Sequence, residues 1–460
     1  MQFTVKHSKA LFLLILLLLS MSVFAQENGS DGLGDEFYPQ MGNGGYDVQH
    51  YTINLSFIPD DNFLDGSTTI EAIAEHDLAS FNLDFFGMEI SSITVNDAEA
   101  DFAREDSEVI ITPAETLLAD ETFIVVVSYS GVPETVDDPG VPFIGLGWQE
   151  WAPGYFAAVS EPSGSMNWFP ANNHPLDKAT FTFIITVPEP NVVAANGILT
   201  DVTENLEGFR SYHWEMNDLM ASYLAIVAVG DFIEVRDDSG DVPIRNYFPA
   251  GTPQNVIDTY DVTGDMMIFL SDMLGEYPFE VYGVVAVPNF PAALETQTLS
   301  IFGAGSPGED TILHELLHQW FGDSVTVAQW KDIWLHEGFA TYFEALWVEH
   351  SAGEDAYNAY IEGYYGFASG AGLSAPGSIE IENLFGGTVY VRGALVLHAL
   401  REEVGDDAFF EILRSFYETY AYDVATTDDF IAIAESVSGQ ELDALFDAWL
   451  YGETVPELAE

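Results

Sequence analysis

Apolar and polar residues alternate in short runs over the first half of the chain. The clearest runs lie at residues 51–57, 67–74, 123–129 and 181–187, and Gly, Pro, Asn and Asp separate them at hairpin-like intervals. A period of two is typical of half-buried strands in antiparallel sheets. We therefore expect residues 46–240 to form an N-terminal antiparallel β domain.

The apolar period lengthens after about residue 250. Apolar residues then recur at the three- and four-residue spacing of amphipathic helices. These helical segments are 256–274, 309–322, 338–350, 389–404, 406–420, 427–438 and 440–450. A short apolar run at 281–287 predicts one strand among them. The predicted fold class is thus a multidomain α and β protein, with a mostly helical second domain and a small sheet over residues 241–460.

The first 45 residues differ from both halves. Residues 1–25 contain Lys6 and Lys9, an apolar run, and small residues at Val23 and Ala25, a pattern typical of a cleaved signal peptide. The apolar run is shorter than the roughly 20 residues that span a bilayer. We therefore expect a secreted or periplasmic protein without stable membrane insertion. The Gly-, Asn- and Asp-rich stretch 26–45 is expected to be a flexible leader.

The charge of the chain restricts its partners. It has 75 Asp and Glu against 11 Lys and Arg, a formal net charge of −64. Such a protein is not expected to bind nucleic acid or anionic lipid, both of which attract basic surfaces. Two interpretations explain the charge: an acidic surface that keeps the protein soluble, and adaptation to a salty habitat. The scarcity of Lys favours the second interpretation, a halophilic protein. Because the chain has no Cys, a metal site must use His, Asp or Glu.

The strongest chemical signal is the sequence His314-Glu315-Leu316-Leu317-His318. Two histidines four residues apart on a helix lie on one face, so both imidazoles can reach one ion. A Glu beside the first His is placed to accept a proton from a metal-bound water. The motif alone leaves a chance match open. Glu337, which opens the next helical stretch, supplies a third candidate ligand.

The surrounding residues resemble a known family. His314-Glu315-x-x-His318 followed after eighteen residues by Glu337 is similar to the gluzincin zinc signature. The string from Trp334 to Glu344, Trp-Leu-His-Glu-Gly-Phe-Ala-Thr-Tyr-Phe-Glu, resembles the aminopeptidase N / leukotriene A4 hydrolase family. The resemblance spans residues 46 to about 452. Within this span three further segments fit the family in the right order: Trp168-Phe169-Pro170, Asp177-Lys178-Ala179-Thr180-Phe181 and Val389-Tyr390-Val391-Arg392-Gly393-Ala394.

This resemblance implies a thermolysin-like catalytic domain with one zinc ion. It implies that the zinc ligands are His314, His318 and Glu337. Two imidazoles and one carboxylate leave a fourth position open, as catalytic zinc requires. It also implies that Glu315 is the general base and that Tyr390 donates a hydrogen bond to the oxyanion of the tetrahedral intermediate.

The resemblance implies further site residues, with some departures from the family's sequence pattern. Glu295 stands where the family has the Glu of a Gly-x-Met-Glu-Asn string, but the neighbouring residues differ. Glu295 and Glu161 are expected to bind the free α-ammonium of a peptide. Glu344 and Asp332 are candidates for holding the ligand imidazoles. His336, although next to Glu337, is expected to be structural.

The sequence therefore predicts a secreted zinc aminopeptidase that acts on peptides with a free N-terminus. Many family members carry a large C-terminal helical domain, and this chain ends soon after the expected catalytic domain. A zinc endopeptidase with an open cleft is therefore an alternative. The other alternative is a secreted binding module with a relic site. The preferred N-terminal residue, the natural substrate and the oligomeric state stay open.

Overall fold

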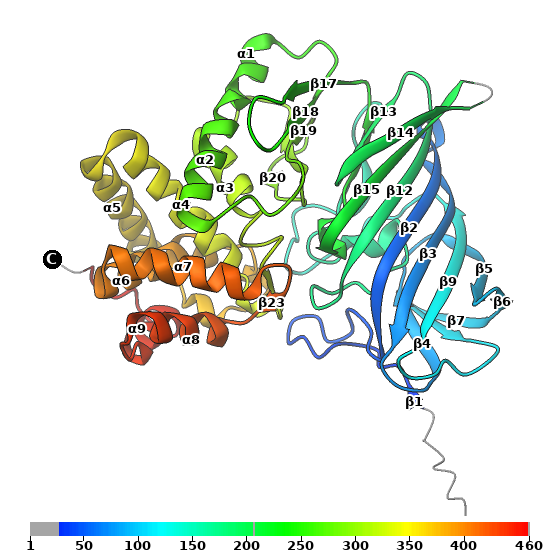
Figure 1. Cartoon of the computed structure of the whole chain (residues 1–460), viewed down its shortest axis with the longest axis horizontal. Helices are drawn as coiled ribbons and strands as arrows, with labels where there is room; N and C mark the ends of the chain where they lie inside the picture. The colour runs from blue at the N-terminus through cyan, green and yellow to red at the C-terminus, as the bar shows by residue number, and fades with distance from the viewer. Residues whose placement is uncertain (1–26, 206–207, 459–460) are drawn as a thin grey trace, which may run out of the picture.

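The chain folds into a β domain and a mostly helical domain that lie side by side (Figure 1). The computed structural model describes residues 27–205 and 208–458. The predicted signal peptide, residues 1–25, lies outside the described residues. Within the described part of the chain, no helix has the length and apolar content needed to cross a bilayer.

The β domain is built on an eight-stranded sheet. All its neighbouring strands are antiparallel except β12 and β2, which run parallel. In spatial order its strands are β14 (Ile198–Glu204), β15 (Phe209–Ala221), β12 (Lys178–Pro188), β2 (Tyr46–Ile58), β3 (Phe63–Ala74), β9 (Thr122–Gly131), β5 (Glu89–Val95) and β6 (Ala98–Glu99). Burial alternates along β2 and β12, as the period-two pattern predicts.

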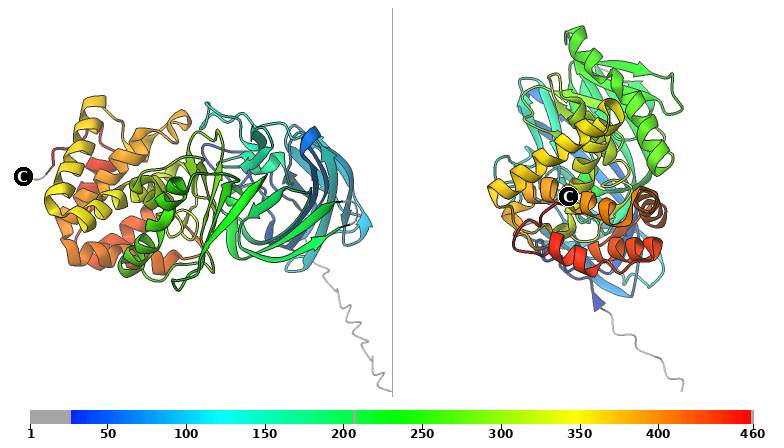
Figure 2. Two further views of the ribbon diagram at one scale, coloured as in Figure 1. Left: turned by 90° about the horizontal axis from the view of Figure 1, so that it is seen from above. Right: turned by 90° about the vertical axis from the view of Figure 1, so that its left-hand side faces the viewer.

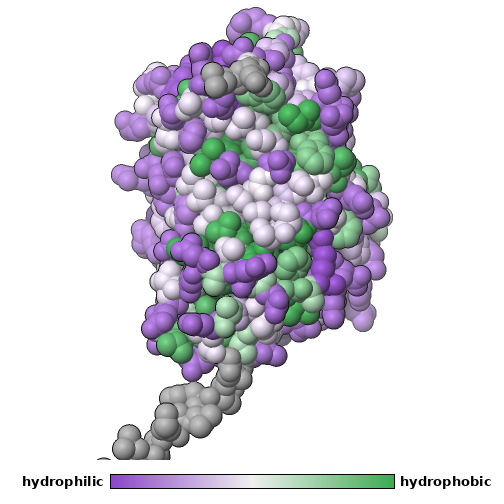
Figure 3. All heavy atoms as spheres, turned by 90° about the vertical axis from the view of Figure 1, so that its right-hand side faces the viewer, coloured by the Kyte–Doolittle hydropathy of each residue, from purple (hydrophilic) through white to green (hydrophobic). Residues whose placement is uncertain are grey.

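Two four-stranded sheets complete this domain. The first has the order β1 (Glu27–Asn28), β4 (Leu78–Asp84), β8 (Glu108–Thr112) and β7 (Asp101–Glu105). The second has the order β10 (Gly147–Ala152), β11 (Tyr155–Val159), β16 (Val227–Gly230) and β13 (Val192–Ala195). On the outer face of the β domain, hydrophobic residues lie in several separate groups among hydrophilic ones (Figure 3).

The second domain combines a five-stranded sheet with helices. The sheet has the order β17 (Phe232–Asp237), β18 (Ile244–Pro249), β19 (Val284–Val287), β21 (Ser300–Gly303) and β20 (Ala293–Leu294). The helices are α1 (Gln254–Ile257), α2 (Thr263–Leu274), α3 (Glu309–Leu317), α4 (Trp334–Ala352), α5 (Glu354–Ala371), α6 (Gly393–Val404), α7 (Asp406–Tyr420), α8 (Thr427–Ser438) and α9 (Asp443–Leu450). The short strands β22 (Thr326–Val327) and β23 (Val424–Ala425) pair with each other. The helices gather at the end of the molecule away from the β domain (Figure 2).

The structure revises three details of the sequence analysis. Strand β17 pairs with β18, so the second sheet begins before the predicted boundary at residue 240. The strand expected at 281–287 is only 284–287. Helix α5 was not predicted, because Gly363, Gly366 and Gly370 interrupt its apolar pattern and glycine disfavours helix interiors.

Residues 27–45 are packed in the structure, in contrast to the flexible leader that the sequence suggested. The segment runs from β1 toward the catalytic domain (Figure 1). Asp35 is only 3% exposed. Its carboxylate accepts hydrogen bonds from the backbone N–H of Tyr38 (3.0 Å) and from that of Trp330 (2.8 Å) in the catalytic domain. The composition of the segment did not indicate that Asp35 packs against the catalytic domain, because a single buried Asp produces no periodic pattern.

A buried lysine also joins the two domains. Lys178, at the start of β12, donates hydrogen bonds to the backbone carbonyls of Asp323 (3.0 Å), Ser324 (2.8 Å) and Asp423 (3.1 Å). The two carbonyls of residues 323 and 324 lie just beyond α3. The β domain thus contacts the part of the catalytic domain that follows the His-Glu-x-x-His motif.

Candidate active site

Two helices of the catalytic domain bring the candidate metal ligands together. Helix α3 carries His314 and Glu315, and His318 is the capping residue directly after its last residue, Leu317. Helix α4 carries Glu337 in its first turn. The ligand atoms of the two histidines and Glu337 all lie within 4.8 Å of one another, and within the described residues this is the single group of its kind.

The separations fit a tetrahedral zinc ion. Glu337 Oε2 lies 3.2 Å from His314 Nε2 and 3.6 Å from His318 Nε2. Ligands at about 2.0–2.1 Å from a tetrahedral ion lie about 3.3–3.4 Å apart. The arrangement therefore has the size and the donor types of a zinc site.

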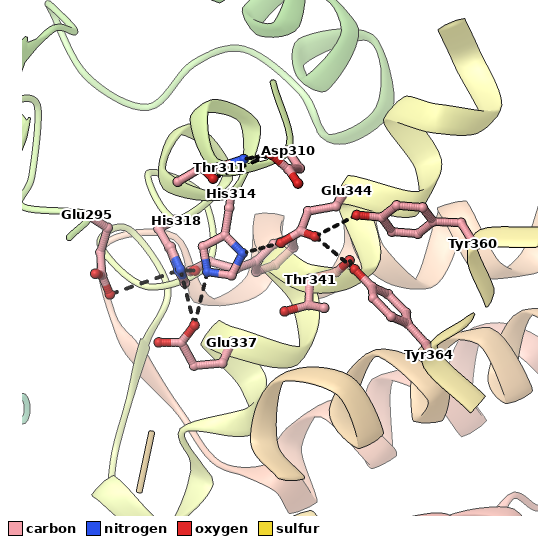
Figure 4. A network of polar contacts seen from close by, with 11 residues as sticks. Glu295, Asp310, Thr311, His314, His318, Glu337, Thr341, Glu344, Tyr360 and Tyr364 are labelled. Carbon is pink, nitrogen blue, oxygen red and sulfur yellow. Dashed lines mark hydrogen bonds and ion pairs between the residues drawn. The ribbon is translucent and has the colours of Figure 1, made fainter. Parts of the chain in front are cut away.

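The far side of each imidazole is held by an acceptor. His314 Nδ1 lies 2.8 Å from Glu344 Oε1, and His318 Nδ1 lies 3.1 Å from the backbone oxygen of Phe321 (Figure 4). A carboxylate and a carbonyl only accept, so each Nδ1 carries the proton and each Nε2 presents its lone pair to the metal position. The structure thus brings Glu344 to the place that the sequence suggested.

Asp332 does not hold a ligand imidazole, in contrast to the sequence-based suggestion. Its Oδ1 accepts a hydrogen bond from the hydroxyl of Thr427 (2.6 Å), at the start of α8. The short helical turn at 330–332 precedes α4 and directs the side chain toward α8. His336 is structural, as expected, because its Nε2 accepts from the backbone N–H of Val327 (3.0 Å).

Glu315 and Tyr390 line the same cavity as the three candidate ligands. Burial raises the pKa of Glu315 to about 8, and the neighbouring imidazoles of His314 and His318 counteract this rise. Tyr390 lies in a π-helical turn, Thr388–Arg392, that precedes α6. Its ring stacks on that of His314 at 5.8 Å between centroids and 12° between planes.

A close helix crossing holds this tyrosine near the metal position. A Cβ added to Gly338 on α4 would lie 2.9 Å from the backbone of Gly393, the first residue of α6. Only a pair of glycines permits so close an approach. The glycines of the two motif strings therefore bring the turn that carries Tyr390 against the helix that carries Glu337.

Glu161 and Glu295 meet in this cavity from different domains. Glu161 follows β11 of the β domain, and Glu295 follows β20 of the catalytic sheet. They are 5% and 2% exposed, and among the described residues neither Oε1 has a hydrogen-bond partner. Burial is the main cause that raises the pKa of both side chains. Nearby carboxylates add to the rise, and at Glu295 the imidazole of His318 opposes it. Glu295 Oε1 makes one longer contact, at 4.0 Å from His318 Nδ1 (Figure 4). Two buried carboxylates that face one cavity favour a cationic ligand.

Gln319 was not identified from the sequence, although it holds this part of the site in place. Its Nε2 donates to the backbone oxygen of Glu295 (3.0 Å), and its Oε1 accepts from the backbone N–H of Thr298 (2.8 Å). Gln319 therefore ties the end of α3 to the segment that carries Glu295. The only sequence signal was its position directly after the second His.

The rest of the cavity wall is apolar. The cavity has a volume of about 120 Å³, and both domains contribute to its lining. Its apolar residues include Phe143, Ile144 and Leu146 from the loop before β10, Phe290 and Leu294 near β20, and Phe385. Phe143 is 70% exposed although it lines the cavity. Such a wall suits an apolar side chain next to the polar centre.

Both domains of the chain match known protein families. The model of the peptidase M1 N-terminal domain matches residues 47–224, and that of the peptidase family M1 domain matches residues 259–449. Aminopeptidase M1-C of Oryza sativa subsp. japonica is 28% identical over 63% of this chain and 36% of its own length. Aminopeptidase M1 of Arabidopsis thaliana is 25% identical over 79% of this chain and 46% of its own length. The chain thus spans less than half the length of these two relatives.

Two solved structures match nearly the whole chain. A mutant of the M1 zinc metallopeptidase from Deinococcus radiodurans, bound to a Tyr-Ser-Ala substrate, is 35% identical, with a TM-score of 0.87 over 93% of this chain and 99% of that chain. A two-domain M1 zinc metallopeptidase bound to L-tryptophan is 36% identical, with a TM-score of 0.87 over 93% of this chain and 100% of that chain. The chain therefore belongs to peptidase family M1, and the metal that its three-residue site fits is the catalytic zinc of that family.

Proposed function

We propose that the protein is a zinc aminopeptidase that removes N-terminal residues from peptides. The observation that carries this proposal is the pair of buried carboxylates, Glu161 and Glu295, which line the cavity beside the metal position and whose Oε1 atoms accept no hydrogen bond among the described residues. A free α-ammonium group would satisfy both acceptors, and their fixed positions would place the first peptide bond next to the metal. The Tyr-Ser-Ala and L-tryptophan bound to the two similar solved structures support this type of ligand.

The residues of the chain divide the chemistry among them. His314, His318 and Glu337 would hold the zinc ion, which supplies a Lewis acid and lowers the pKa of a bound water. Glu315 accepts the proton of the attacking water and donates it to the leaving amine. Burial raises the pKa of Glu315 to about 8, and a carboxyl group with a raised pKa can both accept and release a proton.

Tyr390 would stabilise the charge that develops on the peptide oxygen. Burial raises the pKa of its phenol well above the ordinary value, so the hydroxyl remains a hydrogen-bond donor at neutral pH. A donor held in place before the reaction stabilises the oxyanion without reorganisation. The stacking on His314 keeps the ring beside the ligand.

The mechanism is tested by replacing the base. In Glu315→Gln, we expect zinc to remain bound while peptide hydrolysis falls by about 10²–10⁴-fold, the usual contribution of a general base. Zinc content is measured on the purified protein, and hydrolysis is measured with an aminoacyl reporter. Hydrolysis by the variant at the rate of an active parent would rule out the mechanism. No hydrolysis by the parent itself would indicate a relic site without activity.

A zinc endopeptidase is the second candidate, because the cavity is lined by residues of both domains and its wall includes the exposed Phe143. The two candidates differ in their need for a free N-terminus. We expect hydrolysis of a peptide with a free N-terminus and not of the same peptide after N-acetylation, since an acetylated end carries no charge for Glu161 and Glu295. Equal cleavage of both peptides would identify an endopeptidase.

We also propose that the enzyme is exported and works at high salt. The signal-peptide pattern of residues 1–25 and the net charge of −64 support this proposal. N-terminal sequencing of the expressed protein tests it: the expected first residue lies just after Ala25, and a protein that retains its first 25 residues in the cytoplasm would contradict export.

A further inference from the structure

Three donors surround the carboxylate of Glu344. Its Oε1 faces His314 Nδ1 at 2.8 Å. Its Oε2 accepts hydrogen bonds from the hydroxyls of Tyr364 (2.8 Å) and Tyr360 (3.1 Å), both of which extend from α5 (Figure 4). The hydroxyl of Tyr364 also lies 3.3 Å from the backbone oxygen of Thr341, a longer and weaker alternative. Both oxygens of Glu344 are therefore engaged.

Helix α5 presents the two tyrosines as one unit. They are four residues apart, so both lie on the face of α5 that contacts α4. Their rings pack edge to face, with centroids 4.9 Å apart. Burial, together with the charge of Glu344, raises the pKa of Tyr360 to about 12 and that of Tyr364 further. Both hydroxyls therefore remain donors at any pH at which the protein would work.

A second fixed oxygen changes what Glu344 can do. The side chain of Glu344 is 16% exposed, and a carboxylate held only through Oε1 could rotate toward water. The two phenols fix Oε2 and hence the plane of the carboxylate. Oε1 then stays directed at Nδ1, which keeps the proton on that nitrogen and the lone pair of Nε2 on the metal side.

We propose that Tyr360 and Tyr364 are positioning residues of the metal site, which act through Glu344 to hold His314 in the orientation that binds zinc. This inference rests on the proposed role of His314 as a metal ligand. It assigns a function to α5 beyond packing, and it extends the site to a third helix. The tyrosines do not line the cavity, and the hydrogen bonds that link them to a metal-site side chain are those to Glu344.

The test measures zinc affinity by competition with a chelator, a readout that needs no peptidase activity. Partners that orient metal ligands typically contribute about 10–100-fold to metal affinity. We expect Tyr364→Phe to weaken zinc binding by about 3–10-fold, and the double variant of Tyr364→Phe and Tyr360→Phe by about 10–100-fold. Tyr365→Phe is the matched control, because Tyr365 also lies on α5 but makes no hydrogen bond to the described residues. We expect its affinity to stay unchanged.

Repeating the tyrosine substitutions in the Glu344→Gln protein distinguishes a positioning role of the tyrosines from a packing role. Glu344→Gln removes the charge through which the tyrosines act, so adding both tyrosine changes to it should weaken zinc binding by less than about twofold further. Thermal unfolding of the zinc-free variants is measured alongside, and we expect it to match that of the zinc-free parent. Unchanged zinc affinity in the double variant, an equal loss in Tyr365→Phe, or full additivity with Glu344→Gln would overturn the inference.

An error in the proposed function itself would be detected by a different variant. His314→Ala should abolish tight zinc binding if His314 is a ligand. A His314→Ala protein with the affinity of the parent would refute the ligand assignment itself. Loss of zinc in His314→Ala together with no loss in the tyrosine variants would refute only the role of α5.

Discussion

The packed segment before β2 offers a direct test of how the two domains are joined. We consider Asp35→Ala, which removes a carboxylate that is 3% exposed and links the segment to both domains. On one side Asp35 accepts from the N–H of Trp330 in the catalytic domain. On the other side its carboxylate lies 3.4 Å from Nε2 of His174 in the β domain. A free leader would make no such contacts.

The expected loss of unfolding free energy follows from the backbone N–H donors that Asp35→Ala leaves without an acceptor. The N–H groups of Trp330 and Tyr38 lie at buried residues, and each orphaned buried donor costs about 1–3 kcal/mol. The N–H of Phe37, at a half-buried residue, also bonds to Asp35 but can turn to water. We therefore expect the free energy of unfolding to fall by about 3 kcal/mol.

Urea unfolding followed by tryptophan fluorescence measures this loss, since Trp330 lies at the junction. Asp31→Ala is the control, because Asp31 is exposed in the same segment; it should change the unfolding free energy by less than about 0.5 kcal/mol. If Asp35→Ala behaved like this control, the segment would be a loose leader, and our account of the junction would be wrong.

The same residue predicts a pH dependence with a definite sign. Burial alone would raise the pKa of Asp35, but the hydrogen bonds from His174, Trp330 and Tyr38 together lower it. Because the folded pKa lies below the unfolded one, the stabilisation is present above the unfolded pKa and is lost as pH falls through the folded value. The difference between Asp35→Ala and the parent should therefore be full at pH 7 and shrink as the buffer approaches pH 3. A difference that grew on acidification would contradict this sign.

Three further predictions concern substrates and salt. Glu295→Gln should lower kcat/KM about 10–100-fold for a peptide with a free N-terminus, as expected for a lost charge-assisted hydrogen bond, and an unchanged value would show that Glu295 does not bind the ammonium. Phe143→Ala should lower kcat/KM about 3–10-fold for peptides with an aromatic first residue, because aromatic pairs contribute about 0.5–1.5 kcal/mol. It should leave kcat/KM for alanyl peptides unchanged, and an equal loss for both kinds of peptide would refute a role of Phe143 in selectivity. Raising NaCl from 0.1 to 2 M should raise the urea midpoint by screening the acidic surface, and a lower midpoint would contradict a halophilic protein.

Much of the candidate site could be predicted because its information is local. His314 and His318 lie one turn apart on α3, so their shared face follows from helix geometry alone. Glu344 lies two turns after Glu337 on α4, and the same geometry placed it near the ligands. Asp332 looked equally suitable in the sequence, but it precedes the helix and faces Thr427. Proximity along the chain therefore predicted a partner only within a regular helix.

Helix α5 and the segment 27–45 escaped prediction for a related reason. Tyr360 and Tyr364 gain their role from contact with Glu344, which a pattern of apolar residues does not report. Asp35 lies in a stretch whose composition is typical of a loop, and only its contacts with Trp330 and Tyr38 show that it is buried. In both cases tertiary contacts overrode the local preference.

The sequence by itself predicted the two-domain order, the candidate metal ligands on α3 and α4, and Glu315 as the candidate base, since helical and strand periods and motif spacings are properties of neighbouring residues. Only the tertiary structure decided that Glu161 and Glu295, from different domains, face one cavity. The sequence indicated them only through the resemblance to a family, because 75 acidic residues make any one Glu weak evidence by itself. Folding reduces that ambiguity, because it buries these two carboxylates in the wall of the cavity beside the metal position, where a cationic ligand can neutralise them.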